Sequence, residues 1–250
     1  MVQKAGADAV VKSVLRAFRA EPRLGPYFRL DRVAVEDDGV LVLEGEVAGL
    51  AERKLALLLA AGTPGISRIA DRIRVKPAIP VGDKEIRVRL REILATDSDF
   101  SDLDVREDVA AGVLPTEFKP VTGAAAGARG RIDIEVEDGA AILNGTVPTL
   151  VRKRLAGALA WRIAGVRNVV NGLVVDPPEE DGPDQLEEAV RVVLERNSLF
   201  DAAQIKVGVR GRVVRLTGVL RSKEASVAAA DDAWAVFGVD DVLNEIEVRP

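Results

Sequence analysis

The chain has 250 residues, of which 48% are hydrophobic and 30% are charged, with a formal net charge of −5 and neither histidine nor cysteine. This acidic balance argues against a dedicated nucleic-acid-binding protein, and the lack of cysteine excludes disulfides and zinc–thiolate sites. Because the usual pairs of nucleophile and general base need histidine or cysteine, we expect no enzyme and no cofactor.

The first third of the chain predicts a helix, a hairpin, a second helix and a strand. Apolar residues at helical spacing predict a helix over 8–18, where Asp8 is the expected N-cap. The dipeptide Asp38–Gly39 predicts a β-hairpin, because both residues tolerate positive φ. An alanine- and leucine-rich helix is expected over 51–61, and a glycine turn leads from it into a third strand.

The middle of the chain repeats this order. A helix is expected over 83–94, with Asp83 as its N-cap, and a hairpin turns at Asp138–Gly139. Apolar residues of this hairpin alternate with acidic ones, which is typical of a strand with one buried and one solvated face. A second helix follows over 151–163.

The middle segment is longer than the others by a surplus at 104–130, between its first helix and its hairpin. Long loops in compact domains are usually functional or disordered. Two readings stay open: a docking segment built on Leu114 and Phe118, or an inert and flexible insertion.

The last third repeats the order again. A helix is expected over 184–194 with Asp184 as its N-cap, then a hairpin with the divergent turn Gly211–Arg212. A helix over 223–236 and a final strand complete the segment.

From an anchor glycine onward, the three segments align without a gap. Each has an anchor glycine near the end of its second strand, a second glycine 20 residues later, and an Asp or Asn 26 residues after the anchor. We interpret the glycines as structural turns, and the Asp or Asn side chains as acceptors for their own backbone. The anchors are Gly45, Gly145 and Gly218, the second glycines are Gly65, Gly165 and Gly238, and the polar residues are Asp71, Asn171 and Asn244.

This repetition indicates a triplicated domain. The predicted fold class is α+β, with three tandem αββαβ domains. Each is expected to be a three-stranded mixed sheet with two helices on one face. The expected domains cover residues 1–79, 80–178 and 179–250.

The combination of an Asp-Gly hairpin, an alanine-rich helix, a glycine-aliphatic turn and a final aliphatic strand resembles the BON domain (bacterial OsmY and nodulation). The resemblance covers nearly the whole chain as three copies. It implies a non-enzymatic module related to the envelope or to osmotic stress, of a kind proposed to bind phospholipid surfaces. Some relatives bind partner proteins, and one binds potassium, which makes small-ion binding a third and more distant reading.

Basic residues recur near the start of each second helix. Helix N-termini favour anions, so these cations are candidates for binding lipid phosphates, while the alternative is a solvated, ion-paired helix face. The candidates are Arg53, Lys54, Arg152, Lys153, Arg154, Arg221 and Lys223.

Trp161 and Trp234 occupy one equivalent position in the last turn of the second helix. They are interpreted as core or contact residues, with an interfacial anchor as the alternative. Two functions therefore stay open. One is peripheral binding to anionic phospholipid, and the other is a protein-interaction or assembly scaffold, including a homo-oligomer, that uses the tryptophans and the insertion.

No run of about 18 apolar residues occurs, so we expect no transmembrane segment. The amino-terminal residues are charged and amphipathic, without the apolar core of a secretory signal. As written, the chain is expected in the cytoplasm. If Met1 was added to a trimmed mature protein, the expectation changes to the periplasm or envelope.

Overall fold

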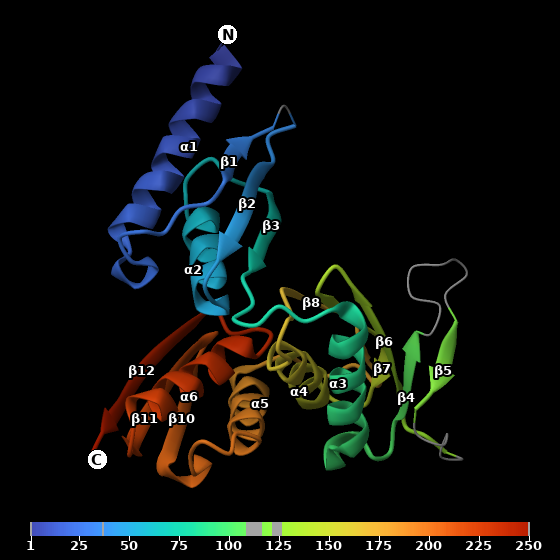
Figure 1. Ribbon diagram of the computed structural model, residues 1–250. Coiled ribbons are helices and arrows are strands. Elements are labelled where there is room, and N and C mark those ends of the chain that lie inside the picture. Colours follow the sequence, from blue (N-terminus) through green and yellow to red (C-terminus); the bar gives the residue numbers. More distant parts are fainter. Residues whose placement is uncertain (1, 37, 109–116, 122–126, 250) are drawn as a thin grey trace. The chain divides into compact units, whose positions relative to one another are not determined.

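The computed structural model describes residues 2–36, 38–108, 117–121 and 127–249 (Figure 1). The chain divides into two compact units, residues 1–76 and 77–250. The first unit contains one αββαβ copy, called copy 1 (α1 to β3). The second unit contains two, called copy 2 (α3 to β9) and copy 3 (α5 to β12).

Copy 1 is a three-stranded mixed sheet with two helices. The central strand β2 runs antiparallel to β1 and parallel to β3. Val14 and Phe18 of the first helix are buried in one core with Leu41 and Leu43 of β2. The elements are α1 (Val2–Ala20), β1 (Arg32–Val35), β2 (Leu41–Val47), α2 (Leu50–Ala61) and β3 (Ile69–Val75), with a short 3-10 helix at Pro22–Leu24.

Copy 2 has the same arrangement around its central strand, β7. This strand pairs antiparallel with β6 and parallel with β8 and β9, which together take the place of β3. Ile134 and Leu143 lie opposite each other in the β6–β7 pair and are both fully buried. The elements are α3 (Asp83–Thr96), β6 (Arg131–Glu137), β7 (Ala140–Val147), α4 (Leu150–Trp161), β8 (Asn168–Asn171) and β9 (Val174–Val175).

The inserted segment enlarges the sheet of copy 2. Its strand β4 (Asp104–Asp108) runs parallel to β6, and β5 (Phe118–Pro120) pairs antiparallel with β4. The sheet order is therefore β5-β4-β6-β7-β8, and β9, which also pairs with β7, makes six strands instead of the expected three. The difference arises because the insertion supplies backbone donors and acceptors to the edge of β6. Leu114 lies outside the described residues.

Copy 3 returns to three strands, with β11 antiparallel to β10 and parallel to β12. The helices α5 and α6 pack beside each other and against this sheet. The elements are α5 (Pro183–Glu195), β10 (Ile205–Arg210), β11 (Val213–Leu220), α6 (Lys223–Ala235) and β12 (Asp241–Val248), with short 3-10 helices at Ser98–Phe100 in copy 2 and Ala202–Gln204 here. The expected α+β fold of three tandem αββαβ copies is confirmed.

The three anchor glycines do not form turns, contrary to the expectation from the sequence. Gly45, Gly145 and Gly218 lie inside β2, β7 and β11 with φ of 151°, 122° and 144°. A Cβ atom at these positions would come within 2.8, 2.2 and 2.0 Å of backbone atoms at the start of the neighbouring hairpin strand. Glycine is therefore required by close backbone approach as well as by conformation.

The aspartates expected to cap the first helices also lie elsewhere. Asp8 is inside α1, while α3 and α5 have Gly82 and Gly182 as N-caps. Asp83 instead accepts hydrogen bonds from the backbone N–H groups of Asp138 and Gly139, at 2.9 and 2.8 Å. Its carboxylate thus ties the start of α3 to the hairpin turn of the same copy.

Candidate functional site

Copies 2 and 3 are joined through the helices α4 and α5, which lie side by side in the second unit. Arg154, near the start of α4, contacts residues around the start of α5. Arg162, which directly follows α4, donates a hydrogen bond to the carbonyl of Val193 near the end of α5, at 2.9 Å. The two helices therefore run in the same direction. We call this contact the α4–α5 joint.

Arg154 is the most deeply buried charge of the joint, with 1% of its surface exposed. Its Nε donates to the carbonyl of Phe237 at 2.9 Å, and its Nη2 donates to Oδ1 of Asp181 at 2.6 Å. Nη1 is buried without a hydrogen-bond partner among the described residues. Removing an ion from water costs on the order of several kcal/mol. A buried guanidinium therefore needs hydrogen-bond partners that offset this cost.

A second polar cluster closes the other end of the joint. Asp232 of copy 3 is buried, and it accepts from Arg162 at 2.7 Å and from Asn197 at 2.7 Å. Arg196 of α5's C-cap pairs with Asp97 at 3.2 Å and also contacts Asp99, both from copy 2. The hydrogen bond to Asp97 is the main reason that the pKa of Arg196 is raised. Charged groups of both copies thus fix the register of the joint.

Most of the basic residues proposed from the sequence as lipid contacts are engaged within the protein. Lys153 lies 5.7 Å above the ring of Phe237, and Lys54 also interacts with another group. Arg154 is buried, as described above. Of the seven basic candidates, Arg221 and Lys223 are the two that are exposed. The remaining ion pairs are Arg53–Asp71 at 2.7 Å and Arg152–Asp102 at 2.8 Å.

The residues proposed for protein contacts also have different environments. Trp234 is buried, with 5% of its surface exposed, whereas Trp161 is half-buried. Phe118 covers Arg106, whose guanidinium is 5.6 Å from the ring centroid. Arg106 in turn pairs with Asp133 at 2.6 Å, so this acidic side chain of β6 is buried by the insertion instead of facing solvent as its alternation predicted.

Each copy has an equivalent space that we call its corner. The corner is bounded by the start of the first helix, the hairpin turn, and the glycine turn after the second helix. The glycines of that turn are Gly65, Gly165 and Gly238, with φ of 92°, 94° and 98°. In each copy, a Cβ atom on this glycine would contact the first helix or the residues at its start.

The corners of copies 2 and 3 are filled in different ways. In copy 2, a Cβ on Gly165 would lie 2.6 Å from Cβ of Val81, and Asp83 closes the corner by bonding to the hairpin turn. In copy 3, the equivalent of Val81 is Asp181, which binds Arg154 from the preceding copy. Beside the guanidinium remains a small hollow of about 220 Å3.

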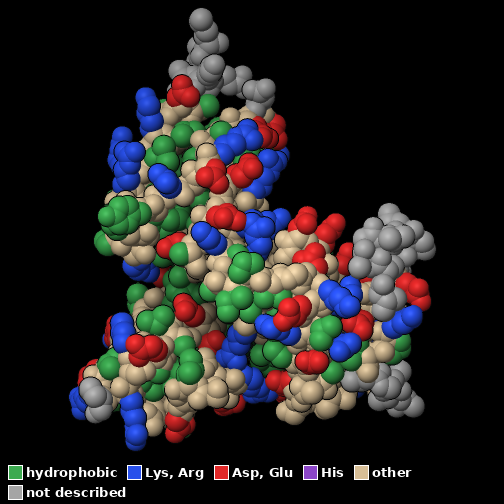
Figure 2. All heavy atoms as spheres, viewed as in Figure 1, with side chains coloured by type: hydrophobic (Ala, Val, Ile, Leu, Met, Phe, Trp, Pro, Cys, Tyr) green, Lys and Arg blue, Asp and Glu red, His purple; other side chains and the backbone are tan. Residues whose placement is uncertain are grey.

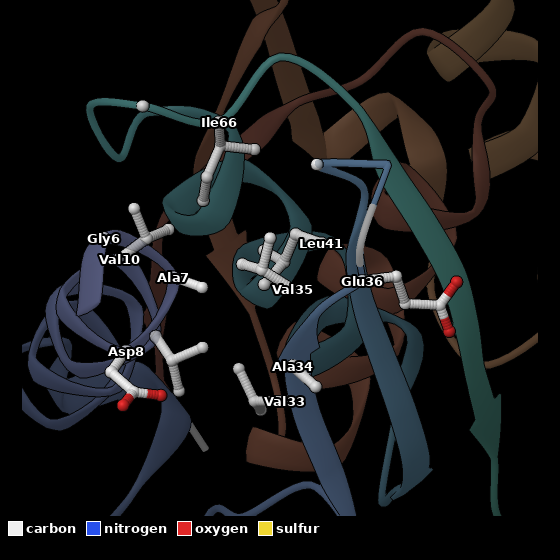
Figure 3. A pocket seen from close by; sticks show the side chains of 13 residues that line it. Gly6, Ala7, Asp8, Val10, Val33, Ala34, Val35, Glu36, Leu41 and Ile66 are labelled. Carbon is white, nitrogen blue, oxygen red and sulfur yellow. The ribbon is translucent and has the colours of Figure 1, made fainter. Parts of the chain in front are cut away.

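The corner of copy 1 is open. It forms a hollow of about 760 Å3 between α1 and the hairpin of β1 and β2 (Figure 3). Val10 on α1 faces Val35 and Leu41 across it, the carboxylate of Asp8 stands at its margin, and that of Glu36 points away from α1. A hollow of this size is within the range of about 300–1,000 Å3 that is common for binding pockets.

Sequence reasoning did not find the corners, because their walls come from three separate segments of each copy. One signal was available. Val81 and Asp181 both stand five residues before the equivalent apolar residues Ile86 and Leu186. A polar residue at such a position needs a partner, but the sequence does not show that Arg154 provides it.

The chemistry of these surfaces is recognition by charge and shape. Within the described ranges, no group of three or more acidic side chains is placed to hold a metal ion. In the same ranges, no helix is both long enough and apolar enough to cross a bilayer.

Comparisons with known proteins agree with the repeat. The family model of the BON domain matches residues 8–77, 124–177 and 183–250, which is more than half of the chain. In copy 2 the match begins after α3, although α3 takes the place that α1 and α5 have in their copies. A comparison with curated proteins finds no match.

Solved structures add no functional information. Two structures of CdsD, a structural protein of the type III secretion system of Chlamydia trachomatis, are each 14% identical to this chain with a TM-score of 0.24. The alignments cover 96% and 97% of this chain and 98% and 93% of those chains. A TM-score this low supports no conclusion about shared fold or function.

Proposed function

Because the chain belongs to the BON domain family, with three copies, we propose that it is a non-catalytic scaffold that binds protein through these copies. The observation that carries this proposal is the burial of Arg154. A basic side chain at a helix start, which is a candidate for lipid phosphates, is instead buried in the corner of another BON copy.

The α4–α5 joint supplies the recognition chemistry of such a scaffold. One BON copy presents its second helix, and the next copy receives it with its first helix and its corner. The contact combines close helix packing with desolvated, hydrogen-bonded charges. Buried charge pairs of this kind give specificity of pairing more than raw affinity.

Photo-crosslinking in cells that produce the full chain tests this proposal. A photoreactive phenylalanine analogue replaces Tyr27 or Val227, which are 92% and 44% exposed, in separate variants. We expect discrete protein adducts from at least one position, identified by mass spectrometry. Adducts only with lipid, or none from either position, would contradict the scaffold.

A second candidate function rests on Arg221 and Lys223. Both are exposed around the start of α6, where free N–H groups also favour anions. These two cations support peripheral binding to anionic phospholipid, as at an envelope surface. The net charge of −5 acts against it, so the attraction would be local to this helix start.

Sedimentation with phosphatidylglycerol vesicles tests the second candidate. The comparison is between the unaltered chain and the variant Arg221→Gln/Lys223→Gln, which retains the helix because glutamine is a good helix former. If lipid binds here, only the unaltered chain sediments at low salt. Added salt releases it, because the Debye length falls from about 10 Å at 0.1 M to about 3 Å at 1 M. Equal behaviour of both proteins excludes this site.

A further inference from the structure

The helix face that forms the joint in copy 2 is uncovered in copy 3. Arg154 stands nine residues after the anchor Gly145, and Val227 stands nine residues after the anchor Gly218. Arg154 is 1% exposed because α5 and its corner cover it, whereas Val227 is 44% exposed. In copy 3, therefore, the position on the second helix that α5 and its corner cover in copy 2 is left exposed.

The receiving surface is open in copy 1. Its α1 is equivalent to α5, since Val10 faces Gly65 as Leu186 faces Gly238. The corner beside α1 is a hollow of about 760 Å3, whereas the corner that holds Arg154 retains about 220 Å3. Among the described residues, α6 therefore offers the face that α4 uses in the joint, and copy 1 offers a corner that can receive it.

The two surfaces match in chemistry when α6 is placed on α1 in the parallel direction of the α4–α5 joint. Val227 then meets the half-buried apolar side chains of Val10 and Val35. Lys223, one helical turn earlier, meets the acidic margin of the corner at Asp8, and Glu36 stands on the other side.

The match continues along the helices. Asp231 lies one turn after Val227 on the same face of α6, and it meets the part of α1 that carries Lys12 and Arg16. Both of these basic side chains are exposed, and Figure 2 shows Lys and Arg side chains along α1. Opposite charges thus face each other at both ends, with an apolar contact between them.

We propose that a second copy of this chain docks on copy 1, with α6 of one molecule packed along α1 and Val227 in the corner of the other. The proposal rests on the scaffold function and identifies the protein that the scaffold binds as a second copy of this chain. Because donor and receiver are different surfaces, the contact is head-to-tail. Such contacts generate rings if they close and filaments if they do not.

Sedimentation velocity over a wide range of concentrations tests the proposal on the full chain. We expect mass that increases with concentration, and an apparent association constant at least about tenfold lower for Val227→Asp, a change of about 1.4 kcal/mol. The matched control is Leu199→Asp, which changes another exposed apolar residue of copy 3 and should associate normally. A monomer at every concentration, or equal association of both variants, overturns the proposal.

A mixing experiment separates loss of the contact from loss of the fold. Asp8→Lys damages only the receiving corner, and Lys223→Glu damages only the donor face. Each variant alone should stay monomeric, with a circular dichroism spectrum like that of the unaltered chain. An equimolar mixture should associate as the unaltered chain does, because Lys223 of one variant meets Asp8 of the other, and the two altered positions, which then carry opposite charges, also attract each other. A mixture that stays monomeric contradicts the assigned pairing.

The outcomes also separate this inference from the scaffold function. Protein adducts in cells together with a strictly monomeric chain would overturn self-association and leave the scaffold standing. A chain that gives no protein adducts and is monomeric would overturn both.

Discussion

Arg53 donates two hydrogen bonds from its guanidinium to Oδ2 of Asp71, at 2.7 and 3.0 Å, and this ion pair replaces a backbone contact found in the other two copies. In copy 2, Nδ2 of Asn171 donates to the carbonyl of Lys153 at 2.7 Å. In copy 3, Asn244 donates to the carbonyl of Ser226 at 2.9 Å. The helix residues of all three contacts stand eight residues after their anchor glycine.

The ion pair replaces the backbone contact in copy 1 because aspartate and asparagine differ in what they can donate. Asp71, Asn171 and Asn244 each use one side-chain oxygen to accept a hydrogen bond from the backbone N–H two residues later. This confirms the local turn expected from the sequence. An asparagine then still has an amide to donate to the helix carbonyl, but an aspartate has none. With Asp71 in copy 1, the donor must come from the helix, and Arg53 supplies it.

Asp71→Ala should therefore destabilise copy 1. The ion pair is largely shielded, with 14% and 24% of the two side chains exposed, so we expect a loss of about 1–3 kcal/mol in the free energy of unfolding. The double variant Arg53→Ser/Asp71→Asn reproduces the residue pair of copy 3 and should recover most of this loss. Urea unfolding followed by circular dichroism measures both. No recovery would show that the two contacts are not equivalent.

Arg154→Ala should weaken the α4–α5 joint. It removes two hydrogen bonds, leaves the carbonyl of Phe237 without its donor and opens a cavity, for a loss of about 2–4 kcal/mol. In calorimetry, copies 2 and 3 should then unfold at more clearly separated temperatures. Arg154→Met, which keeps much of the volume, should lose less. An unchanged profile for Arg154→Ala would mean that the joint does not couple the copies.

Gly218→Ala should destabilise copy 3 severely. The added Cβ would lie 2.0 Å from the carbonyl oxygen of Gln204, at a φ of 144° that side chains rarely adopt, so we expect a loss above about 2 kcal/mol. Gly208 lies in β10 of the same copy and has no atom within 4 Å of the corresponding Cβ position. Gly208→Ala is therefore the control, and its thermal midpoint should stay close to that of the unaltered chain.

Asp231 provides a prediction on pH. The pKa of Asp231 is raised, mainly by partial burial and to a smaller extent by the charge of neighbouring Asp232. The folded state therefore holds this proton more tightly than the unfolded state does, and its contribution to stability is lost as pH rises from about 4, the ordinary pKa of aspartate. Asp231→Asn should be more stable than the unaltered chain at pH 7, and the gain should shrink toward pH 3. A gain that does not depend on pH would contradict this assignment.

Several features followed from local pattern alone. The helices over 83–94 and 184–194 were predicted from apolar spacing, and they are present as α3 and α5. The hairpin turn at Asp138–Gly139 was predicted from residue type, and both residues have positive φ. These features depend on neighbours within a few residues, so their physical causes are visible in the sequence.

Other features depend on groups far apart in the chain. The strands β4 and β5 were not predicted, because their pairing is with β6 and with each other, and short polar strands show little periodicity. The sequence did not distinguish Arg154 from Arg152 and Lys153, which stand in the same basic run. The difference between a buried joint residue and a surface cation arises 83 residues away, at the carbonyl of Phe237.

The sequence by itself determined the αββαβ order and its three repetitions, because helical spacing, hairpin turns and glycine positions are set by local backbone preference. The tertiary structure alone decided how the copies use their equivalent surfaces. One corner is closed by its own Val81 and Asp83, one holds Arg154 from another copy, and one is open beside α1. The physical reason is that desolvation and charge pairing depend on distance in space, and only the packed chain sets those distances.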